Sequence, residues 1–396
     1  MNILYEISAK LRASVKVDFV RKIIEKFDQP DRMIGIKGPR GVGKTTLLLQ
    51  YLRLKLEDKI ALYISLDDLY FTENSFLDTA DSFVKNGGTV LLVDEVHHYE
   101  NWAKELKNAY DRYPELKIIF TGSSMLRMES SRGDLSRRAV IYPIQGLSLR
   151  EYIRFTGGPE FPVLRLQQIL HNHRTLAETV WSRIKPIQKF NEYLQYGYFP
   201  FASENIATYH LRLKEIINIV METDLPYMAE IEYSKIDKVK QLLYIISQSV
   251  PFKPNMIKLA ERTGIARNTL KNYLRYLAEA GLIHLLYSSS KGISLLTKPE
   301  KIYMANPNLL FALAAAQADK GNLRETFFIN QLSVDHDVQY PQQGDFLVDD
   351  KYIFEVGGRN KKLSQIKGLT DAYLALDDIE SGLANHIPLW LFGFLY

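Results

Sequence analysis

The sequence predicts an α/β protein that begins with a parallel sheet covered by helices on both faces. From residue 33 to about residue 142, short and nearly continuous apolar runs alternate with amphipathic helical stretches, as expected when strands are buried on both faces. The chain has 396 residues, which is too long for one ordinary hydrophobic core. The expected domains are the sheet domain at 1–156, a helical region at 157–235, a winged helix-turn-helix at 236–300 and a smaller α/β domain at 301–396.

Five apolar runs are the expected strands of the first domain. They are MIGIK (33–37), KIALYISL (59–66), TVLLVD (89–94), LKIIFTG (116–122) and AVIYPI (139–144). Before them, residues 18–27 have helical spacing and are expected to form a helix across the site at the end of the first run. After them, residues 146–155 are expected to form a helix, and the glycine and proline break TGGPEFP at 156–162 marks a domain boundary.

Composition excludes several classes of function. Hydrophobic residues make up 46% and charged residues 24% of the chain, the balance of a folded soluble protein. The absence of cysteine excludes disulfides, thiolate zinc sites and cysteine nucleophiles, and it fits a reducing, cytoplasmic location. No apolar run approaches the roughly 18 residues of a spanning helix, so no membrane partner is expected. The apolar end, residues 387–396, is expected to be a buried terminal strand, and the net charge of +4 permits nucleic-acid contact without arguing for it.

The segment GPRGVGKT, from Gly38 to Thr45, has the G-x-x-x-x-G-K-[ST] spacing of a phosphate-binding loop. Glycines let backbone amides turn toward phosphates, and the helix that follows directs its positive end at them. Lys44 is expected to reach the β and γ phosphates, and the Thr45 hydroxyl to ligate Mg²⁺. The expected nucleotide-binding residues are Gly38, Pro39, Arg40, Gly41, Val42, Gly43, Lys44, Thr45 and Thr46.

The segment VLLVDEVHHYE, at residues 90–100, places two carboxylates at the end of a buried strand, where open sheets hold their ligands. Asp94 is expected to support Mg²⁺, and Glu95 to act as general base on the attacking water. The alternative is that the acidic pair only caps a strand. His97 and His98 follow directly, but adjacent side chains rarely converge on one ion and Mg²⁺ prefers oxygen, so no metal site is expected there.

Two further segments are candidates for γ-phosphate contacts. In KIIFTGSSML (117–126), a buried strand ends at Thr121, Ser123 and Ser124. These hydroxyls are candidate γ-phosphate sensors, with Ser123 as the catalytic candidate, and the alternative is a plain strand-ending turn. In GDLSRRAVIYPI (133–144), Arg137 and Arg138 precede the fifth strand. An arginine supplied to a neighbouring subunit's nucleotide would stabilise transition-state charge; the alternative is a solvated basic pair.

Residues 257–292 have the pattern of a winged helix-turn-helix: a short helix, a turn at Gly264, a longer helix and a small hairpin. Helical spacing places Leu270, Tyr273, Leu274 and Leu277 on the inner face. The outer face then carries Arg267, Asn268, Lys271, Asn272 and Arg275. This set suits double-stranded DNA, but it equally suits a domain contact or a solvated face.

In this order, GPRGVGKT, VLLVDE, FTGSS and LSRRAVIYPIQGLSLREY resemble AAA-type P-loop ATPases that carry a C-terminal domain of unknown function, the AAA_14 plus DUF4143 arrangement of bacteria and archaea. Further landmarks are FNEYLQYGYFP, ETDL with Asp224, KIYMANPNLL, and GNLRETFFINQL with Glu325. The resemblance implies ATP with Mg²⁺ and a homo-oligomer whose arginine finger falls on Arg138. Relatives often carry glycine where this chain has Arg137, which leaves the choice of finger open.

The resemblance also implies a restriction-endonuclease-like fold at 301–396. Nucleases of that fold use two carboxylates to hold Mg²⁺ and a lysine to position water. Asp345 and Glu355 match the carboxylates, but Gly357 stands at the lysine position, so Arg359 or Lys361 would have to substitute. We therefore expect an inactive module in which Glu325, Asp345 and Glu355 are remnants.

Functions of different classes stay open at this point. One is an ATP-hydrolysing switch whose ATPase and C-terminal domains change arrangement with the γ phosphate. The others are a DNA- or protein-binding module that holds ATP structurally, and an ATP-regulated nuclease. Intact Lys44, Thr45, Asp94 and Glu95 favour the switch, because a purely structural site has no use for a glutamate that activates water.

Overall fold

The computed structural model describes residues 1–56, 60–122, 135, 137–226, 231–249, 251–288, 298–314, 319–362 and 365–396. The chain divides into two compact units, Met1–Gly146 and Leu147–Tyr396. This division falls before the glycine and proline break at 156–162, so the helix that precedes the break packs in the second unit. The boundaries expected at 235 and 300 remain predictions. Among the described residues, no helix combines the length and the apolar character that crossing a bilayer requires.

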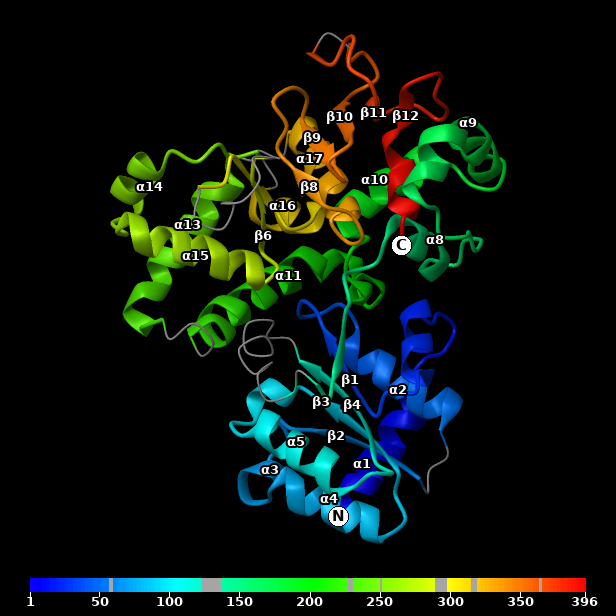
Figure 1. The fold of residues 1–396 in the computed structure, drawn as a ribbon, viewed down its shortest axis with the longest axis vertical. Coiled ribbons are helices and arrows are strands. Elements are labelled where there is room, and N and C mark those ends of the chain that lie inside the picture. Colours follow the sequence, from blue (N-terminus) through cyan, green and yellow to red (C-terminus); the bar gives the residue numbers. More distant parts are fainter. Residues whose placement is uncertain are drawn as a thin grey trace. The chain divides into compact units, whose positions relative to one another are not determined.

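The first unit is built on a five-stranded, fully parallel sheet, as the apolar runs predict (Figure 1). The strand order is β2-β3-β4-β1-β5. The carboxyl ends of all five strands therefore meet at one edge, where parallel sheets hold ligands. The strands are β1 (Met33–Lys37), β2 (Ala61–Ser65), β3 (Val90–Asp94), β4 (Lys117–Gly122) and β5 (Val140–Pro143).

Helices cover both faces of this sheet. Alternate strand residues such as Leu91 and Phe120 join one core cluster with Trp102 and Phe83, from the helices of one face, because successive side chains of a strand point to opposite faces. Helix α2 packs against β2, β3 and β4 on the other face. The helices are α1 (Asn2–Ser14), α2 (Lys44–Lys55), α3 (Tyr70–Glu73), α4 (Phe76–Lys85) and α5 (Trp102–Arg112).

Two amino-terminal segments differ from expectation. Helix α1 is not predicted by the sequence reading; it packs against β2 and α2, and its Ser8 hydroxyl accepts a hydrogen bond from the Tyr63 amide at 3.1 Å. The α-helix expected at 18–27 is instead a 3₁₀ helix, η1 (Lys22–Asp28), which packs against α2. Its buried residues Ile24 and Phe27 are three apart, which matches the three residues per turn of a 3₁₀ helix.

The second unit begins with several helices, and the buried side chain of Asn308 links some of them by hydrogen bonds. Ser148 and Glu151 form a capping box at the start of α8. Asn308 is fully buried: its Oδ1 accepts from the Tyr198 amide at 2.8 Å and the Tyr209 hydroxyl at 2.5 Å, and its Nδ2 donates to the carbonyls of Tyr193 and Leu194. Two landmarks of the sequence, YGYFP and NPNLL, are thereby joined. The helices are α8 (Leu149–Phe155), α9 (Leu166–Trp181), α10 (Pro186–Tyr196), α11 (Tyr209–Ile219), α16 (Pro307–Ala314) and α17 (Lys320–Leu332), with short helices η3 (Pro200–Ser203), η4 (Ile206–Thr208) and the π-helix η5 (Val220–Asp224).

A helix-turn-helix with a short antiparallel strand pair lies within this unit. Helix α14 begins at Asn255, whose side chain accepts from the amides of Ile257 and Lys258, and it ends at Gly264 in the left-handed conformation. The strand pair extends beyond the expected boundary at residue 300, and Phe252 bridges to Ile302 beside it. The elements are η6 (Tyr233–Lys235), α13 (Ile236–Ser247), α14 (Met256–Thr263), α15 (Arg267–Glu279), β6 (Ile283–Leu286) and β7 (Lys301–Met304).

The carboxyl-terminal part holds a mixed sheet of order β12-β11-β10-β9-β8. The strands β9 and β10 pair antiparallel, and β10, β11 and β12 are parallel. The buried strand expected at 387–396 is wrong: only the first residues belong to β12, and a buried 3₁₀ helix follows. A continuous apolar run does not distinguish a buried strand from a buried helix. The elements are β8 (Val338–Gln339), β9 (Phe346–Val348), β10 (Tyr352–Gly357), β11 (Ala372–Leu376), β12 (His386–Pro388) and η8 (Leu389–Phe394).

Candidate functional site

The glycines of the loop between β1 and α2 are required by its geometry. A Cβ on Gly38 would lie 2.1 Å from the carbonyl oxygen of Ile144. Gly41 and Gly43 have φ of 84° and 93°, values that strain any residue with a Cβ. Helix α2 begins immediately after Gly43, so its positive end lies at the loop. Among the other loop residues, Val42 is buried, Pro39 and Arg40 are half-buried and Thr46 is exposed.

Lys44 turns back over the loop. Its side chain is buried, with 4% of the residue exposed, and its Nζ donates to the carbonyls of Gly38 at 3.0 Å and Pro39 at 2.9 Å. A buried ammonium group needs such acceptors. The positive charge is therefore held inside the turn formed by the loop, where an anion bound by the loop would meet it.

Asp94, at the end of β3, lies at the centre of a group of hydroxyls. Its carboxylate accepts from Thr45 Oγ1 at 2.6 Å, from the Tyr63 hydroxyl at 2.9 Å and from Thr121 Oγ1. The neighbouring strands β2 and β4 supply Tyr63 and Thr121, and α2 supplies Thr45. Burial and then the charge of Asp94 raise the pKa of Tyr63. The two expected Mg²⁺ ligands, Thr45 and Asp94, are thus in direct contact.

Glu95 has a strained backbone. Its φ of 50° and ψ of 41° are left-handed, which is uncommon for a residue other than glycine and is found where surrounding structure enforces it. Its amide donates to Thr121 Oγ1 at 3.3 Å. The pKa of Glu95 is raised, mainly by burial, although the nearby Lys44 lowers it. A carboxylate with a raised pKa is a better proton acceptor near neutral pH.

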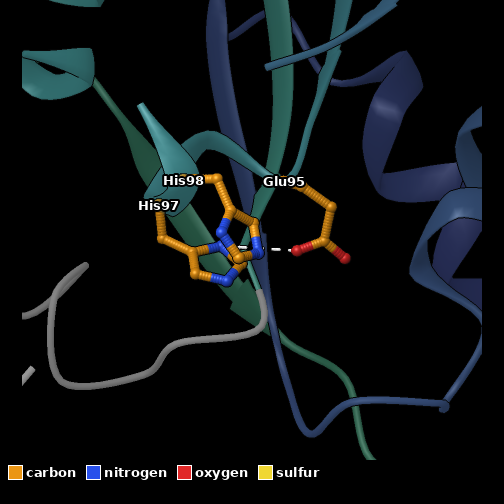
Figure 2. A group of neighbouring side chains, drawn as sticks. All are labelled: Glu95, His97 and His98. Atoms are coloured by element: carbon orange, nitrogen blue, oxygen red, sulfur yellow. Dashed lines mark ion pairs between the residues drawn. The ribbon is translucent and has the colours of Figure 1, made fainter. Parts of the chain in front are cut away.

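Glu95, His97 and His98 lie together. The sequence predicts no metal site here because adjacent side chains rarely converge, and that reason is wrong for this segment. Their ligand atoms all lie within 4.8 Å of one another, and Figure 2 shows the Glu95 carboxylate directed toward the two rings. His97 is buried, and its Nδ1 is 3.4 Å from Glu95 Oε2. The imidazole rings of His97 and His98 have centroids 4.2 Å apart.

The remaining candidates of the first unit are the expected γ-phosphate sensors and the two arginines. Thr121 lies beside Asp94, whereas Ser123 and Ser124 lie outside the residues that the structure describes. Arg138 forms a two-pronged ion pair with Asp111 of α5, with Nε at 2.8 Å and Nη2 at 2.9 Å from its oxygens. Arg137 is exposed. An Arg138 finger would have to exchange Asp111 for a phosphate.

The sequence reading missed Tyr63. Tyr63 lies inside an apolar strand, and no sequence motif around it indicates a functional residue. The signal is the sheet register: Ser65 of β2 pairs with Asp94 of β3, so Tyr63 lies two residues before the position opposite the carboxylate. That signal becomes available only when the strand order is known.

The expected exposure of α15 is confirmed. Leu270, Tyr273, Leu274 and Leu277 are buried. Arg275 lies 3.7 Å from Glu279 and over the Tyr276 ring, so its charge is partly compensated. The exposed residues are Arg267, Asn268, Lys271, Asn272 and Arg275.

In the carboxyl-terminal part, two lysines accompany the expected acidic remnants. Lys301 Nζ lies between Glu325 Oε2 at 3.2 Å and Asp345 Oδ1 at 3.3 Å. Glu355 is fully buried and pairs with Lys361 Nζ at 2.7 Å. Arg359, the other proposed substitute, is exposed.

Lys361 lies beside the glycine that replaces the expected lysine. A Cβ on Gly357 would meet the Lys361 side-chain carbons at 2.6 to 2.8 Å, so Lys361 fills the space that a side chain at 357 would take. Among the described residues, the carboxylates of Glu325, Asp345 and Glu355 do not form a ligand group within 4.8 Å. Instead, the ammonium group of Lys301 lies between the carboxylates of Glu325 and Asp345 and offsets their negative charge.

Comparison with known proteins places two family matches on the chain. Residues 30–153 match the AAA_14 model, an AAA domain. Residues 187–320 match DUF8612, a domain of unknown function. The expected DUF4143 identity is therefore not supported, and DUF8612 takes its place.

Two proteins of Methanocaldococcus jannaschii are similar in sequence. MJ1637, described as uncharacterized, is 29% identical over 302 residues, which cover 72% of this chain and 63% of that protein. This chain thus spans less than two thirds of that relative. MJ1544, also described as uncharacterized, is 25% identical over 377 residues, which cover 90% of this chain and 79% of that protein.

Among solved structures, a Walker-type ATPase of Pyrococcus abyssi is similar over 73% of this chain and 93% of its own, with 13% identity and a TM-score of 0.42. The RuvB Holliday junction branch migration motor of Thermotoga maritima is similar over 72% and 90%, with 14% identity and a TM-score of 0.28. The family matches are more specific than either of these similarities. The chain thus matches an AAA domain over residues 30–153 and DUF8612 over residues 187–320.

Proposed function

We propose that this chain binds ATP with Mg²⁺ at the loop from Gly38 to Thr45 and hydrolyses it. The observation that carries the proposal is the 2.6 Å contact between Thr45 Oγ1 and the Asp94 carboxylate, directly beside Glu95. The AAA match over 30–153 supports the same chemistry. The switch between the ATPase and C-terminal domains is part of the proposal.

The residues at this site suit both Mg²⁺ and the phosphates of ATP. The oxygen donors Thr45 and Asp94 are of the kind that Mg²⁺ prefers, and Lys44 and the end of α2 supply positive charge for phosphates. Gly38 is required because a Cβ there would clash with the backbone of Ile144, and Gly41 and Gly43 allow the left-handed turns that shape the loop. Bound Mg²⁺ would neutralise phosphate charge.

Glu95 is proposed as the general base. Its strained backbone and the hydrogen bond from its amide to Thr121 support a fixed carboxylate position. Burial raises its pKa, which favours proton transfer from water to the carboxylate. Asp94, in contrast, accepts hydrogen bonds from three hydroxyls and is assigned to the metal. The two adjacent carboxylates thus have different roles because their surroundings differ.

The test is Mg²⁺-dependent ATP hydrolysis by the full chain, with ATP binding measured separately. Lys44→Ala should abolish turnover. Glu95→Gln should bind ATP as well as the parent but hydrolyse it about 10²- to 10⁴-fold more slowly, the usual contribution of a general base. Glu100→Gln, an exposed neighbour in the same segment, is the matched control and should retain the parent rate. If Glu95→Gln turns over as fast as the parent, the assignment of Glu95 is wrong.

The trans arginine is a separate part of the proposal. An arginine supplied by a neighbouring copy requires a homo-oligomer, and Arg138 would have to exchange its two-pronged pair with Asp111 for a phosphate. Arg138→Ala should abolish turnover without loss of ATP binding, and mixing it with Lys44→Ala chains should restore part of the activity. No recovery in mixed oligomers would remove the trans assignment, and the same experiment with Arg137→Ala decides between the two arginines.

A second candidate function is binding of double-stranded DNA through α15. The exposed basic and amide side chains, opposite a buried apolar face, favour it. Binding of a double-stranded oligonucleotide should weaken with salt and with Lys271→Ala plus Arg275→Ala. Lys10→Ala plus Lys22→Ala removes the same charge from exposed positions of the first unit and is the control. Equal affinity of the two double variants would argue against a role for α15.

A further inference from the structure

We propose that Glu95, His97 and His98 form a site for a transition-metal dication of the Zn²⁺ class, distinct from the Mg²⁺ ligands Thr45 and Asp94. We further propose that a metal ion bound there withdraws Glu95 from its role as general base. The second statement rests on the proposed function, whereas the first does not.

The distances within the group suit one ion. Ligands at about 2.0–2.2 Å from a tetrahedral metal lie roughly 3.3–3.6 Å from one another. The separation of His97 Nδ1 and Glu95 Oε2 is 3.4 Å. All three ligand atoms lie within 4.8 Å of one another, so the His98 nitrogen is the ligand that would have to move closer on metal binding. Figure 2 shows both rings on the side toward which the carboxylate is directed.

The local backbone explains how adjacent histidines converge. Glu95 is left-handed and reverses the chain at the end of β3, and a 3₁₀ turn, η2 (Val96–His98), follows at once. The His98 amide donates to the Glu95 carbonyl at 3.1 Å, which holds the backbones of these two residues close together. The centroids of the His97 and His98 rings are 4.2 Å apart, and His97 Nδ1 is 3.4 Å from Glu95 Oε2, so His97 belongs to the same group. In an extended strand, His97 and His98 would point to opposite faces.

The site is open to solvent on the His98 side. His98 lines a cleft of about 510 Å³ together with Asp67, Asp68 and Glu100. These carboxylates make the approach favourable for a cation. Three protein ligands would leave a fourth coordination position for water, as in other zinc sites of this kind.

The ligand set selects the class of metal. Two imidazoles and one carboxylate suit Zn²⁺, Co²⁺, Ni²⁺ and Cu²⁺, whereas Mg²⁺ takes oxygen ligands in octahedral geometry. The Thr45 and Asp94 pair, with oxygen donors only, would keep Mg²⁺. The two metals would therefore bind at neighbouring positions with little competition. A carboxylate that coordinates Zn²⁺ is a much weaker base, because the metal draws negative charge from it, so hydrolysis would slow while the phosphate loop stays intact.

Binding is tested first, on the full chain without nucleotide and without a histidine tag. Zn²⁺ is titrated by calorimetry, and Co²⁺ is added as a spectroscopic probe whose visible absorption reports tetrahedral nitrogen and oxygen ligation. We expect one ion per chain. His98→Ala and Glu95→Gln should each weaken binding by about 100-fold or more, since loss of even an outer-shell partner costs 10–100-fold.

His336→Ala is the matched control, because His336 also pairs with a carboxylate, Asp349, at 2.7 Å. It should bind the ion as the parent does. Since His97 is buried, His97→Ala is interpreted only if thermal unfolding shows it folded; His98→Ala and Glu95→Gln carry the test otherwise. The proposal is overturned if no ion binds stoichiometrically, if His98→Ala binds as tightly as the parent, or if His336→Ala removes the binding.

Inhibition is tested at saturating Mg²⁺-ATP, with free Zn²⁺ set by a metal buffer because ATP itself chelates Zn²⁺. Zn²⁺ should lower kcat with little change in the KM for ATP, and His98→Ala should lose this response relative to its own metal-free rate. A response that His98→Ala retains refutes the second statement. If the chain binds Zn²⁺ as expected but hydrolyses no ATP under any condition, the proposed function fails and the metal site stands. If hydrolysis depends on Glu95 but no Zn²⁺ binds, the metal site fails and the proposed function stands.

Discussion

Replacement of Lys44 by methionine is the sharpest test of the phosphate loop. The side chain keeps a similar length and loses its charge. In the structure, Nζ already donates to the carbonyls of Gly38 and Pro39 at 3.0 and 2.9 Å. ATP binding would exchange these two bonds for bonds to phosphate oxygens, so only the difference contributes to affinity.

The magnitude follows from that exchange. Two hydrogen bonds between charged groups contribute about 3–6 kcal/mol, and two bonds to backbone carbonyls are given up. The net loss on removing the ammonium group is then about 2–4 kcal/mol, which is roughly 30- to 700-fold in the dissociation constant for ATP. Calorimetry or displacement of a fluorescent ATP analogue, in the presence of Mg²⁺, measures it.

Lys55→Met is the control on the same helix. Lys55 lies at the opposite end of α2, is about half exposed and is 3.6 Å from Asp28. The Lys55→Met substitution removes one positive charge from α2, as Lys44→Met does, and should change ATP affinity by no more than about twofold. The reasoning is refuted if Lys44→Met binds ATP within threefold of the parent, or if Lys55→Met loses as much affinity as Lys44→Met.

Two further predictions concern the second unit. Asn308→Leu should lower the free energy of unfolding by about 3 kcal/mol, because it leaves the buried Tyr198 amide, Tyr209 hydroxyl and the carbonyls at 193 and 194 without their partner; chemical denaturation measures it, and a loss below 1 kcal/mol would contradict the assigned role. Burial, and then the charge of Asp345, raise the pKa of Glu325 above its usual value of 4.5, so the folded chain binds more protons than the unfolded chain just above pH 4.5. The unfolding free energy should therefore contain a contribution that falls as pH rises through this window, and Glu325→Gln should flatten that part of the pH profile; an unchanged slope would mean that Glu325 does not titrate there.

Short-range patterns were predictable from the sequence because their physical causes are local. The five strands from Met33 to Pro143, the loop at Gly38–Thr45 and the inner face of α15 all depend on periodicity or on glycine spacing within a few residues. Helix α1 and the 3₁₀ helix η1 were missed or assigned to the wrong type, because their stability comes from packing on α2 and β2. The terminal run was placed in a strand because hydrophobicity alone does not report whether helices or strands surround it.

The sequence by itself determined that a loop for polyphosphate precedes a helix and that two carboxylates end a buried strand. Only the tertiary structure decided which groups meet there: Tyr63 reaches Asp94 through strand order, and Lys361 fills the space beside Gly357 across a turn. It also brought His97 and His98 to Glu95, against the sequence expectation, because a left-handed residue and a 3₁₀ turn replace the extended backbone that an apolar strand predicts. Residue spacing sets which groups are neighbours along one element, whereas contacts between elements depend on the register and the backbone reversals of the folded chain.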